Sequence, residues 1–432
     1  MNNVRKTIAL FLCTLVLAAG VACTPVCAES LTFNDFRKQL EWVEHAFVGH
    51  AITEAELIRG ARDGLLSFIT HNPALKSKPH FRRSVYFVTD MRGLEKAYEE
   101  CTQTLSASDS HAAMYALLDG MVRSLHDKYS VFMTPKNSLA FFSLFQDKKY
   151  VGIGILWIKR LGYPEINKVL EDAPAARAGL RAKDIIIAVD GKSMYRKDEH
   201  IITQALLGVE GSVVHVTVRR HNGVHTFVIT RAHVQWKSVA CYVADHVAHI
   251  EVRFFGEETN SEIDALMTHL SMLPLKGYVL DLRDNPGGYV GAAVHMVSKF
   301  VPGGSVVLFS KNRAGYYFTV TDGSYVETAR PLVVLINKDS ASAAEITAGA
   351  LKDYGHTVIG ETSYGKGCIQ QPSFMRDGSV VKLTVALWKT PKYHPINQVG
   401  IKPDIEVKND DNTDVDTQLI RAIQEVLKQA VR

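Results

Sequence analysis

Cysteine pairs, strong net charge and long apolar segments are all scarce in this sequence, and each scarcity excludes a class of protein. Three of the six cysteines lie in the first 28 residues, which leaves Cys101, Cys241 and Cys368, far apart and odd in number. This is not a disulfide framework. The formal net charge of +4 is too small to favour nucleic acid as a partner. The sequence shows no metal-ligand spacing, since His246 and His249 fall in an alternating apolar stretch that favours a strand.

The N-terminus carries the one long apolar run, at residues 8–22, directly after Arg5 and Lys6. Small residues follow at 26–28, as at a signal-peptidase cleavage point. We therefore expect residues 1–28 to be a secretory signal and the mature chain to begin at Glu29. No other segment is long and apolar enough to span a bilayer. The protein is expected to be exported, to the periplasm or the cell envelope.

A lipid anchor is the alternative fate of this leader. The pair Ala22-Cys23 resembles a lipoprotein processing site, but Gly20 stands where a larger apolar residue is usual. Cleavage after Ala28 is therefore the expectation, and a lipid-modified Cys23 is the only route to the membrane that the sequence offers.

The apolar pattern divides the exported chain into three parts. Residues 29–145 show helical spacing, with two similar stretches at 55–68 and 111–125. Residues 146–235 give short alternating runs separated by Gly, Pro and Asp-Gly, as in a β-rich module. Residues 236–432 alternate strands and helices and end in an amphipathic helix. The fold class is therefore multidomain α/β: a helical domain, an inserted β-rich module and an α/β core.

Ser342 is a candidate nucleophile because it falls where an alanine-rich amphipathic helix begins. Asp339 and Ser340 can cap that helix, and its unpaired N–H groups favour a developing oxyanion nearby. A serine at a helix start is more often a simple cap, so this stretch alone does not decide the matter.

No histidine near Ser342 suggests itself as a base, but Lys366 follows the strand 357–360 directly after that helix. Elements adjacent in sequence are usually adjacent in space, so Lys366 can reach the Ser342 end of the helix. A lysine is a base only when neutral, and burial can lower its pKa toward neutrality. A solvated loop lysine is the common alternative, which only the partnership with Ser342 outweighs.

Two other patterns compete with this pair. Residues 360–366 match a phosphate-binding loop, but Gly367 lacks the magnesium-binding hydroxyl and β-type residues follow instead of a helix. Ser379 and Lys382 are spaced as in penicillin-recognising enzymes, but they lie on an alternating strand, where they point to opposite faces. Neither pattern is expected to be functional.

A third element, DLRDNPGG at 281–288, ends an apolar strand. Its glycines expose N–H groups, so Gly287 or Gly288 could pair with the amide of Ala343 to hold an oxyanion. An ordinary strand-to-helix turn explains the same residues equally well.

Together these motifs resemble the carboxyl-terminal processing peptidases, or tail-specific proteases. The resemblance includes 120–135 (GMVRSLHDKYSVFMTP), 252–255 (VRFF), 281–288, 340–355 (SASAAEITAGALKDYG), 365–370 (GKGCIQ), 377–391 and 400–407. It implies that Ser342 is the nucleophile, Lys366 the general base and Gln370 the residue that orients it. Glu345 matches an acidic position of the motif whose role is less certain. No metal or organic cofactor is implied.

The same resemblance makes 146–235 a PDZ domain, preceded by the signal and helical segments and followed by the peptidase core. Its carboxylate-binding loop would comprise Val151, Gly152, Ile153, Gly154 and Ile155, which take up an apolar C-terminal tail of a protein or peptide substrate. Lys183 stands where the family has a glycine, and Cys368 where a hydroxyl or aliphatic residue is usual. A non-catalytic PDZ adaptor or chaperone is the alternative function, although it would be expected to lose Ser342 or Lys366.

Overall fold

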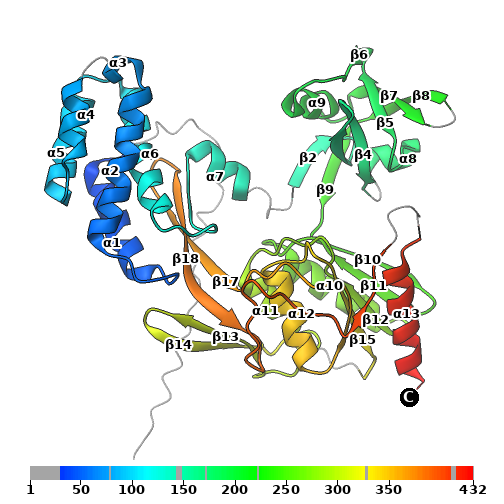
Figure 1. Ribbon diagram of the computed structural model, residues 1–432. Helices are drawn as coiled ribbons and strands as arrows, with labels where there is room; N and C mark the ends of the chain where they lie inside the picture. The colour runs from blue at the N-terminus through cyan, green and yellow to red at the C-terminus, as the bar shows by residue number, and fades with distance from the viewer. Residues whose placement is uncertain are drawn as a thin grey trace, which may run out of the picture.

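The computed structural model describes residues 30–76, 79–142, 148–170, 173–220, 223–325, 329–409 and 415–431. The predicted secretory signal lies outside these residues. Figure 1 shows three regions: helices of the N-terminal part, an α/β core, and a β-rich module that connects to the rest through β2 and β9. No helix in the described ranges has both the length and the hydropathy of a membrane span.

The N-terminal region is helical, as its apolar spacing predicts. Its two central helices, α2 and α6, approach closely because glycines line their crossing: a side chain at Gly64 would place its Cβ 2.0 Å from the Ala116 carbonyl oxygen. The helices are α1 (Phe33–Ala46), α2 (Glu54–His71), α3 (Pro73–Lys76), α4 (Pro79–Tyr86), α5 (Met91–Thr102), α6 (Ala107–Arg123) and α7 (Pro135–Phe142).

A β-hairpin from the C-terminal half reaches into this helical region. It consists of β17 (Cys368–Phe374) and β18 (Val380–Lys389), and β18 pairs with the short strand β1 (Val131–Met133). Val381 and Leu383 of β18 belong to the same buried cluster as the helices. The hairpin also joins β13 (Val306–Asn312) and β14 (Gly315–Val320) in one sheet. This sheet therefore ties the helical region to the core.

The β-rich module is a sheet of order β3-β4-β5-β7-β8 with β6 beside β5, so that β3 is an edge strand of the described sheet. Strands β2 and β9 pair with each other in a separate two-stranded sheet, which connects this module to the rest of the chain. The elements are β2 (Lys148–Gly152), β3 (Ile155–Arg160), β4 (Tyr163–Val169), α8 (Pro174–Ala178), β5 (Ile185–Val189), β6 (Lys192–Ser193), α9 (Glu199–Leu206), β7 (Val213–Arg220), β8 (Gly223–Thr230) and β9 (Ala232–Trp236).

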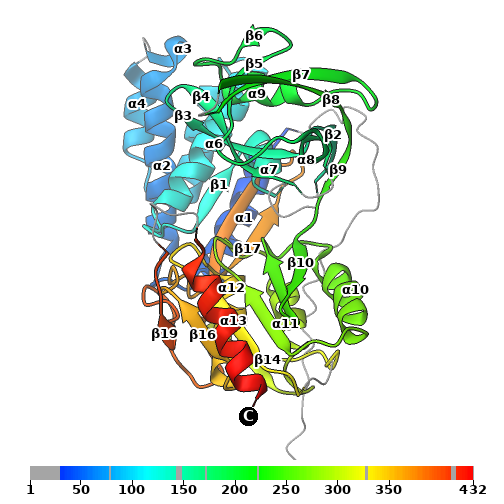
Figure 2. The ribbon, with the colours of Figure 1, turned by 90° about the vertical axis from the view of Figure 1, so that its right-hand side faces the viewer.

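The core is a sheet of order β10-β11-β12-β15-β16-β19, parallel from β11 onward. Helices α10, α11 and α12 pack on one face and α13 on the other, which explains why β12 and β15 are buried throughout. Figure 2 shows α13 lying across the face of the core sheet that it covers. The elements are β10 (Val239–Ala244), β11 (Val247–Val252), α10 (Thr259–Ser271), β12 (Gly277–Asp281), α11 (Val290–Val297), β15 (Leu332–Ile336), α12 (Ala343–Asp353), β16 (Thr357–Gly360), β19 (Ile405–Glu406) and α13 (Thr417–Ala430).

These elements confirm the α/β multidomain prediction. Residues 247–249 begin strand β11, as the alternation indicates, whereas His246 lies in the preceding turn with φ 62°. In a parallel sheet, the loops that follow the carboxyl ends of β12, β15 and β16 meet at one edge. Residues 282–288, 337–342 and 361–367 are these loops, so the fold gathers all three sequence motifs there.

Candidate active site

Ser342 is itself the N-cap of α12, with φ 57° and ψ −114°. The expected caps, Asp339 and Ser340, do not fill that position. Ser340 instead accepts a hydrogen bond from the Asn337 N–H and donates to the Leu282 carbonyl, so it braces the loop that follows β15. A non-glycine residue at positive φ is strained and is frequent at functional sites. The sequence prediction differs because α12 begins one residue after Ser342 and the Ser340 hydroxyl is used within the loops.

Glu345 joins the two candidate catalytic segments. Its Oε2 accepts the Ser342 N–H at 2.9 Å and the Lys366 N–H at 2.8 Å. Its Oε1 accepts the Gly365 N–H at 2.7 Å and the Ser363 hydroxyl at 2.5 Å. The side chain is fully buried. The backbones of Ser342 and Lys366 are therefore neighbours because they bind one carboxylate oxygen.

The loop after β12 lies directly against Ser342. A side chain at Gly287 would place its Cβ 2.7 Å from Ser342 Cβ and 3.0 Å from the Ala343 nitrogen. The Gly287 N–H already donates to Asn285 Oδ1 at 2.8 Å. In the described part of the chain, by contrast, no acceptor is found for the N–H groups of Gly288 and Ala343. Ala343 directly follows Ser342, and Gly288 directly follows the glycine that lies against Ser342.

Lys366 lies in a half-buried position between the core and the helical region. Its Nζ is 5.5 Å from the centre of the Tyr129 ring. Burial lowers the pKa of Lys366, while the nearby Cys368, Glu345 and Asp127 act in the opposite direction and do not reverse it. No hydrogen bond joins Lys366 Nζ to Ser342 Oγ among the described residues, so the pair is adjacent through its backbone.

Gln370 does not contact Lys366 by hydrogen bonding in this structure. Its Nε2 donates to the Tyr129 carbonyl, and its Oε1 accepts from Lys382 Nζ at 3.0 Å. Lys382 is therefore part of this pocket, which sequence reasoning missed. Ser379 lies just before β18, and its hydroxyl donates to Asp377 Oδ1, whereas Lys382 is a residue of the strand. Periodicity alone does not say which face looks toward the site.

The loop between α6 and β1 closes this pocket, and sequence reasoning gave its residues no role. Asp127 Oδ2 accepts from the N–H and hydroxyl of Ser130, at 3.0 and 2.6 Å, and from Thr384 Oγ1 at 2.6 Å. These bonds fix Tyr129 beside β18 and hence beside Lys366. Asp127 and Tyr129 belong to the family motif at 120–135, but only the pairing of β1 with β18 shows that this motif lies beside Lys366.

Cys368 is buried, and burial raises the pKa of its thiol. A thiol must ionise to act as a nucleophile, so this environment is that of a structural cysteine. Among the described residues, Cys101, Cys241 and Cys368 form no disulfide bond.

The predicted carboxylate-binding loop connects β2 to β3. Gly154 has φ 79°, and Ile153 and Ile155 are buried. Three carbonyl groups of the loop accept backbone hydrogen bonds. The Val151 carbonyl accepts from the Gly208 N–H, that of Ile153 from Ala175, and that of Gly154 from Leu170. Within the described residues, the N–H groups of Ile153 and Gly154 have no acceptor. The loop therefore presents donors beside the edge strand β3.

Comparison with known proteins identifies the family and the domains of this chain. A model of peptidase family S41 matches residues 246–407, and a PDZ-domain model matches 165–220. The carboxy-terminal processing protease CtpB of Bacillus subtilis is 34% identical over 333 residues, which cover 74% of this chain and 68% of that protein. The chain belongs to the carboxy-terminal processing proteases. It is a serine peptidase with a PDZ domain, as the sequence motifs predict.

One further relative supports the assignment, and one solved structure shares the fold. A CtpA-like serine protease of Staphylococcus saprophyticus is 32% identical over 328 residues, covering 74% of this chain and 67% of that protein. The crystal structure of an S41 protease from Bacteroides fragilis superposes with a TM-score of 0.51 at 15% identity, over 74% of this chain and 90% of that one. The second likeness shows a shared fold alone.

Proposed function

We propose that this processing protease is an exported endopeptidase that binds the C-terminal tail of protein substrates through its PDZ domain and cleaves near that tail. Ser342 is the nucleophile and Lys366 the general base. The observation that carries this proposal is the shared Glu345 oxygen, which brings the backbones of Ser342 and Lys366 together. Because all four hydrogen bonds of Glu345 are accepted ones, its role is to position these residues, not to transfer a proton.

The proposed reaction passes through an acyl-enzyme. The neutral amine of Lys366 takes the proton of Ser342 Oγ as that oxygen attacks the scissile carbonyl carbon. The N–H groups of Ala343 and Gly288 stabilise the oxyanion, since the Gly287 N–H already has an acceptor. Protonated Lys366 then gives its proton to the leaving amine. A water molecule, activated by the same lysine, hydrolyses the ester and frees Ser342.

Separate substitutions of the two residues test this chemistry. Ser342→Ala and Lys366→Ala should each abolish cleavage of a denatured substrate with an apolar tail, with products mapped by mass spectrometry. The double variant should be no worse than either single one, because nucleophile and base act as a unit. Lys338→Ala, an exposed lysine on the Ser342 loop, is the control. Cleavage by folded Ser342→Ala would favour the alternative, a non-catalytic PDZ adaptor with a contaminating activity.

Tail recognition is proposed to use the loop of Val151, Gly152, Ile153, Gly154 and Ile155. The unpaired N–H groups of Ile153 and Gly154 support it, as does the edge strand β3, where an extended peptide can add. A charge-assisted hydrogen bond contributes ~1.5–3 kcal/mol, so amidating the substrate's C-terminus should lower kcat/KM roughly tenfold or more. An aspartate in place of a terminal alanine should also weaken cleavage. Equal rates for acid and amide peptides would place tail recognition elsewhere.

Export is proposed from the leader sequence. Mass analysis of protein from the producing cell should find an N-terminus at Glu29. A lipid-modified Cys23 would instead make this an anchored enzyme.

A further inference from the structure

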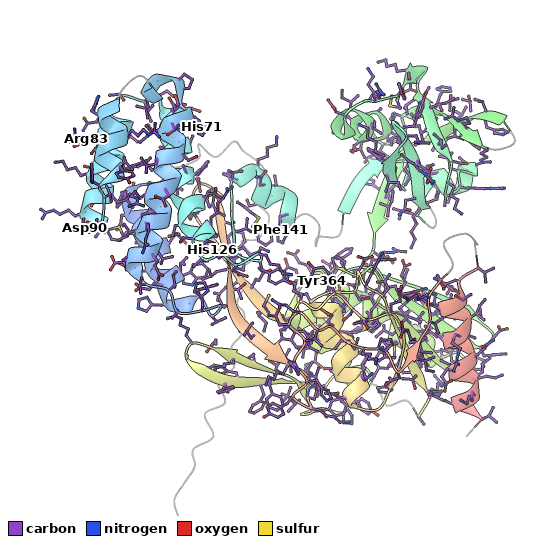
Figure 3. The ribbon with its side chains drawn as sticks, viewed as in Figure 1. His71, Arg83, Asp90, His126, Phe141 and Tyr364 are labelled. Atoms are coloured by element: carbon purple, nitrogen blue, oxygen red, sulfur yellow. The ribbon has the colours of Figure 1, made fainter. Side chains whose placement is uncertain are left out.

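The least expected side chain of the pocket is Lys382, on β18. Its Nζ is 3.0 Å from Gln370 Oε1 and lies 4.8 Å from the centre of the Phe141 ring. Figure 3 shows Phe141 on α7 and Tyr364 on the core at the junction between the helical region and the core. A half-buried ammonium group at this junction needs an explanation, because most lysines are solvated.

One consequence of the Lys382 contact is a fixed amide. Gln370 donates through Nε2 to the Tyr129 carbonyl, and Lys382 binds its Oε1. A carbonyl oxygen has two lone pairs, so Oε1 can accept a second donor. Tyr129, whose carbonyl holds this amide, also places its ring against Lys366. Gln370 Oε1 is therefore held toward Lys382, and Tyr129 connects this amide to Lys366.

A second consequence is electrostatic. Two ammonium groups in one partly desolvated pocket repel, and this repulsion favours the state in which one of them is neutral. Burial, followed by the nearby Lys366, lowers the pKa of Lys382 to about 8. Burial is the cause of the lowered pKa of Lys366 itself, and because repulsion between two like charges acts on both partners, a charged Lys382 adds to that effect. The other ionisable groups around the pair are Glu345 of α12, Asp127, Lys128 and Tyr129 of the α6–β1 loop, and Cys368 of β17.

We propose that Lys382 is a positioning residue for the general base: its Nζ fixes the Gln370 amide, and its positive charge favours the neutral, base-competent form of Lys366. This inference rests on the proposed catalytic pair. In this proposal Gln370 orients Lys366 and is itself oriented by Lys382. Lys382 therefore acts together with Gln370 and not with Ser379.

Lys382→Met and Lys382→Arg separate this role from a structural one. The methionine removes donor and charge, so the acidic limb of the kcat/KM profile should move up by about one pH unit. Activity on the acidic side should fall about tenfold, mainly in kcat, and recover at higher pH. Arginine keeps a donor and a permanent charge, so the acidic limb of the kcat/KM profile of Lys382→Arg should lie at or below the wild-type pH.

The same comparison distinguishes failure of this inference from failure of the proposed function. If Ser342→Ala abolishes cleavage but Lys382→Met keeps the wild-type limb, the inference on Lys382 is wrong and the catalytic pair stands. A loss of rate that is equal at every pH would also overturn it, since only packing would have changed. If the methionine variant is unfolded by circular dichroism, the limb of Lys382→Gln gives the same test. The rate at which a phosphonate probe labels Ser342, measured against pH, checks the result without peptide turnover.

Discussion

Replacing Glu345 by glutamine tests whether one buried carboxylate holds the site together. Each of its two oxygens accepts two hydrogen bonds. The four donors are three backbone N–H groups and the Ser363 hydroxyl. Glutamine has nearly the same shape, but one oxygen becomes an NH₂ group that cannot accept. Whichever way the amide turns, at least one N–H group loses its acceptor.

The magnitude follows from the geometry. If the NH₂ replaces Oε1, it can face the Ser363 oxygen, but the buried Gly365 N–H loses its acceptor, at ~1–3 kcal/mol. The bonds from Ser342 and Lys366 then go to a neutral oxygen and weaken by about 1 kcal/mol each. We expect the free energy of unfolding to fall by ~3–5 kcal/mol. The opposite orientation costs more, because both catalytic segments would lose their acceptor.

The assay is denaturant unfolding together with kcat/KM on one free-acid peptide. We expect kcat to fall about a hundredfold, since a displacement near 1 Å in a catalytic group has that effect. Glu361→Gln is the control. Glu361 lies on the loop 361–367, which also carries Lys366, and its side chain makes no hydrogen bond in the described residues. If Glu345→Gln kept both its stability and a kcat within twofold of wild type, the carboxylate would not be what joins Ser342 to Lys366.

Three smaller predictions concern stability. Lys183 has φ 69°, so Lys183→Gly should stabilise the PDZ domain by ~1 kcal/mol in thermal unfolding, and a loss of stability would contradict the strain. Arg220→Met should destabilise it by ~3–5 kcal/mol, because it leaves the buried Asp184 without its two-bond partner; an unchanged midpoint would mean that the pair contributes nothing. Hydrogen bonds from His249 and Arg283 outweigh burial and hold the pKa of Asp281 at about 2, below its ordinary 3.8. This stability, ~2 kcal/mol, is present above pH 4 and lost toward pH 2. Asp281→Asn should flatten that acid slope, which denaturant titrations at pH 2–5 would detect.

The local patterns predicted much of the fold and the central pair. Helical spacing at 55–68 and 111–125 anticipates α2 and α6, and the order of helix, strand and glycine loop places Lys366 near Ser342. These features depend on residues close together in the chain, for which periodicity is informative. The cap prediction failed because α12 begins at Ala343, which makes Ser342 the N-cap, while the Ser340 hydroxyl is bonded to the loop after β12.

The sequence by itself determined the three-part organisation, the family motifs and the candidates Ser342, Lys366 and Glu345, because each belongs to one continuous segment. Only the tertiary structure decided that Glu345 serves two segments at once, that the Gly287 N–H is bonded to Asn285, and that Lys382 contacts Gln370. Asp127 and Tyr129 lie more than 200 residues before the strands that they support. Strand pairing between β1 and β18 creates those contacts, and no local pattern encodes which distant strands will pair.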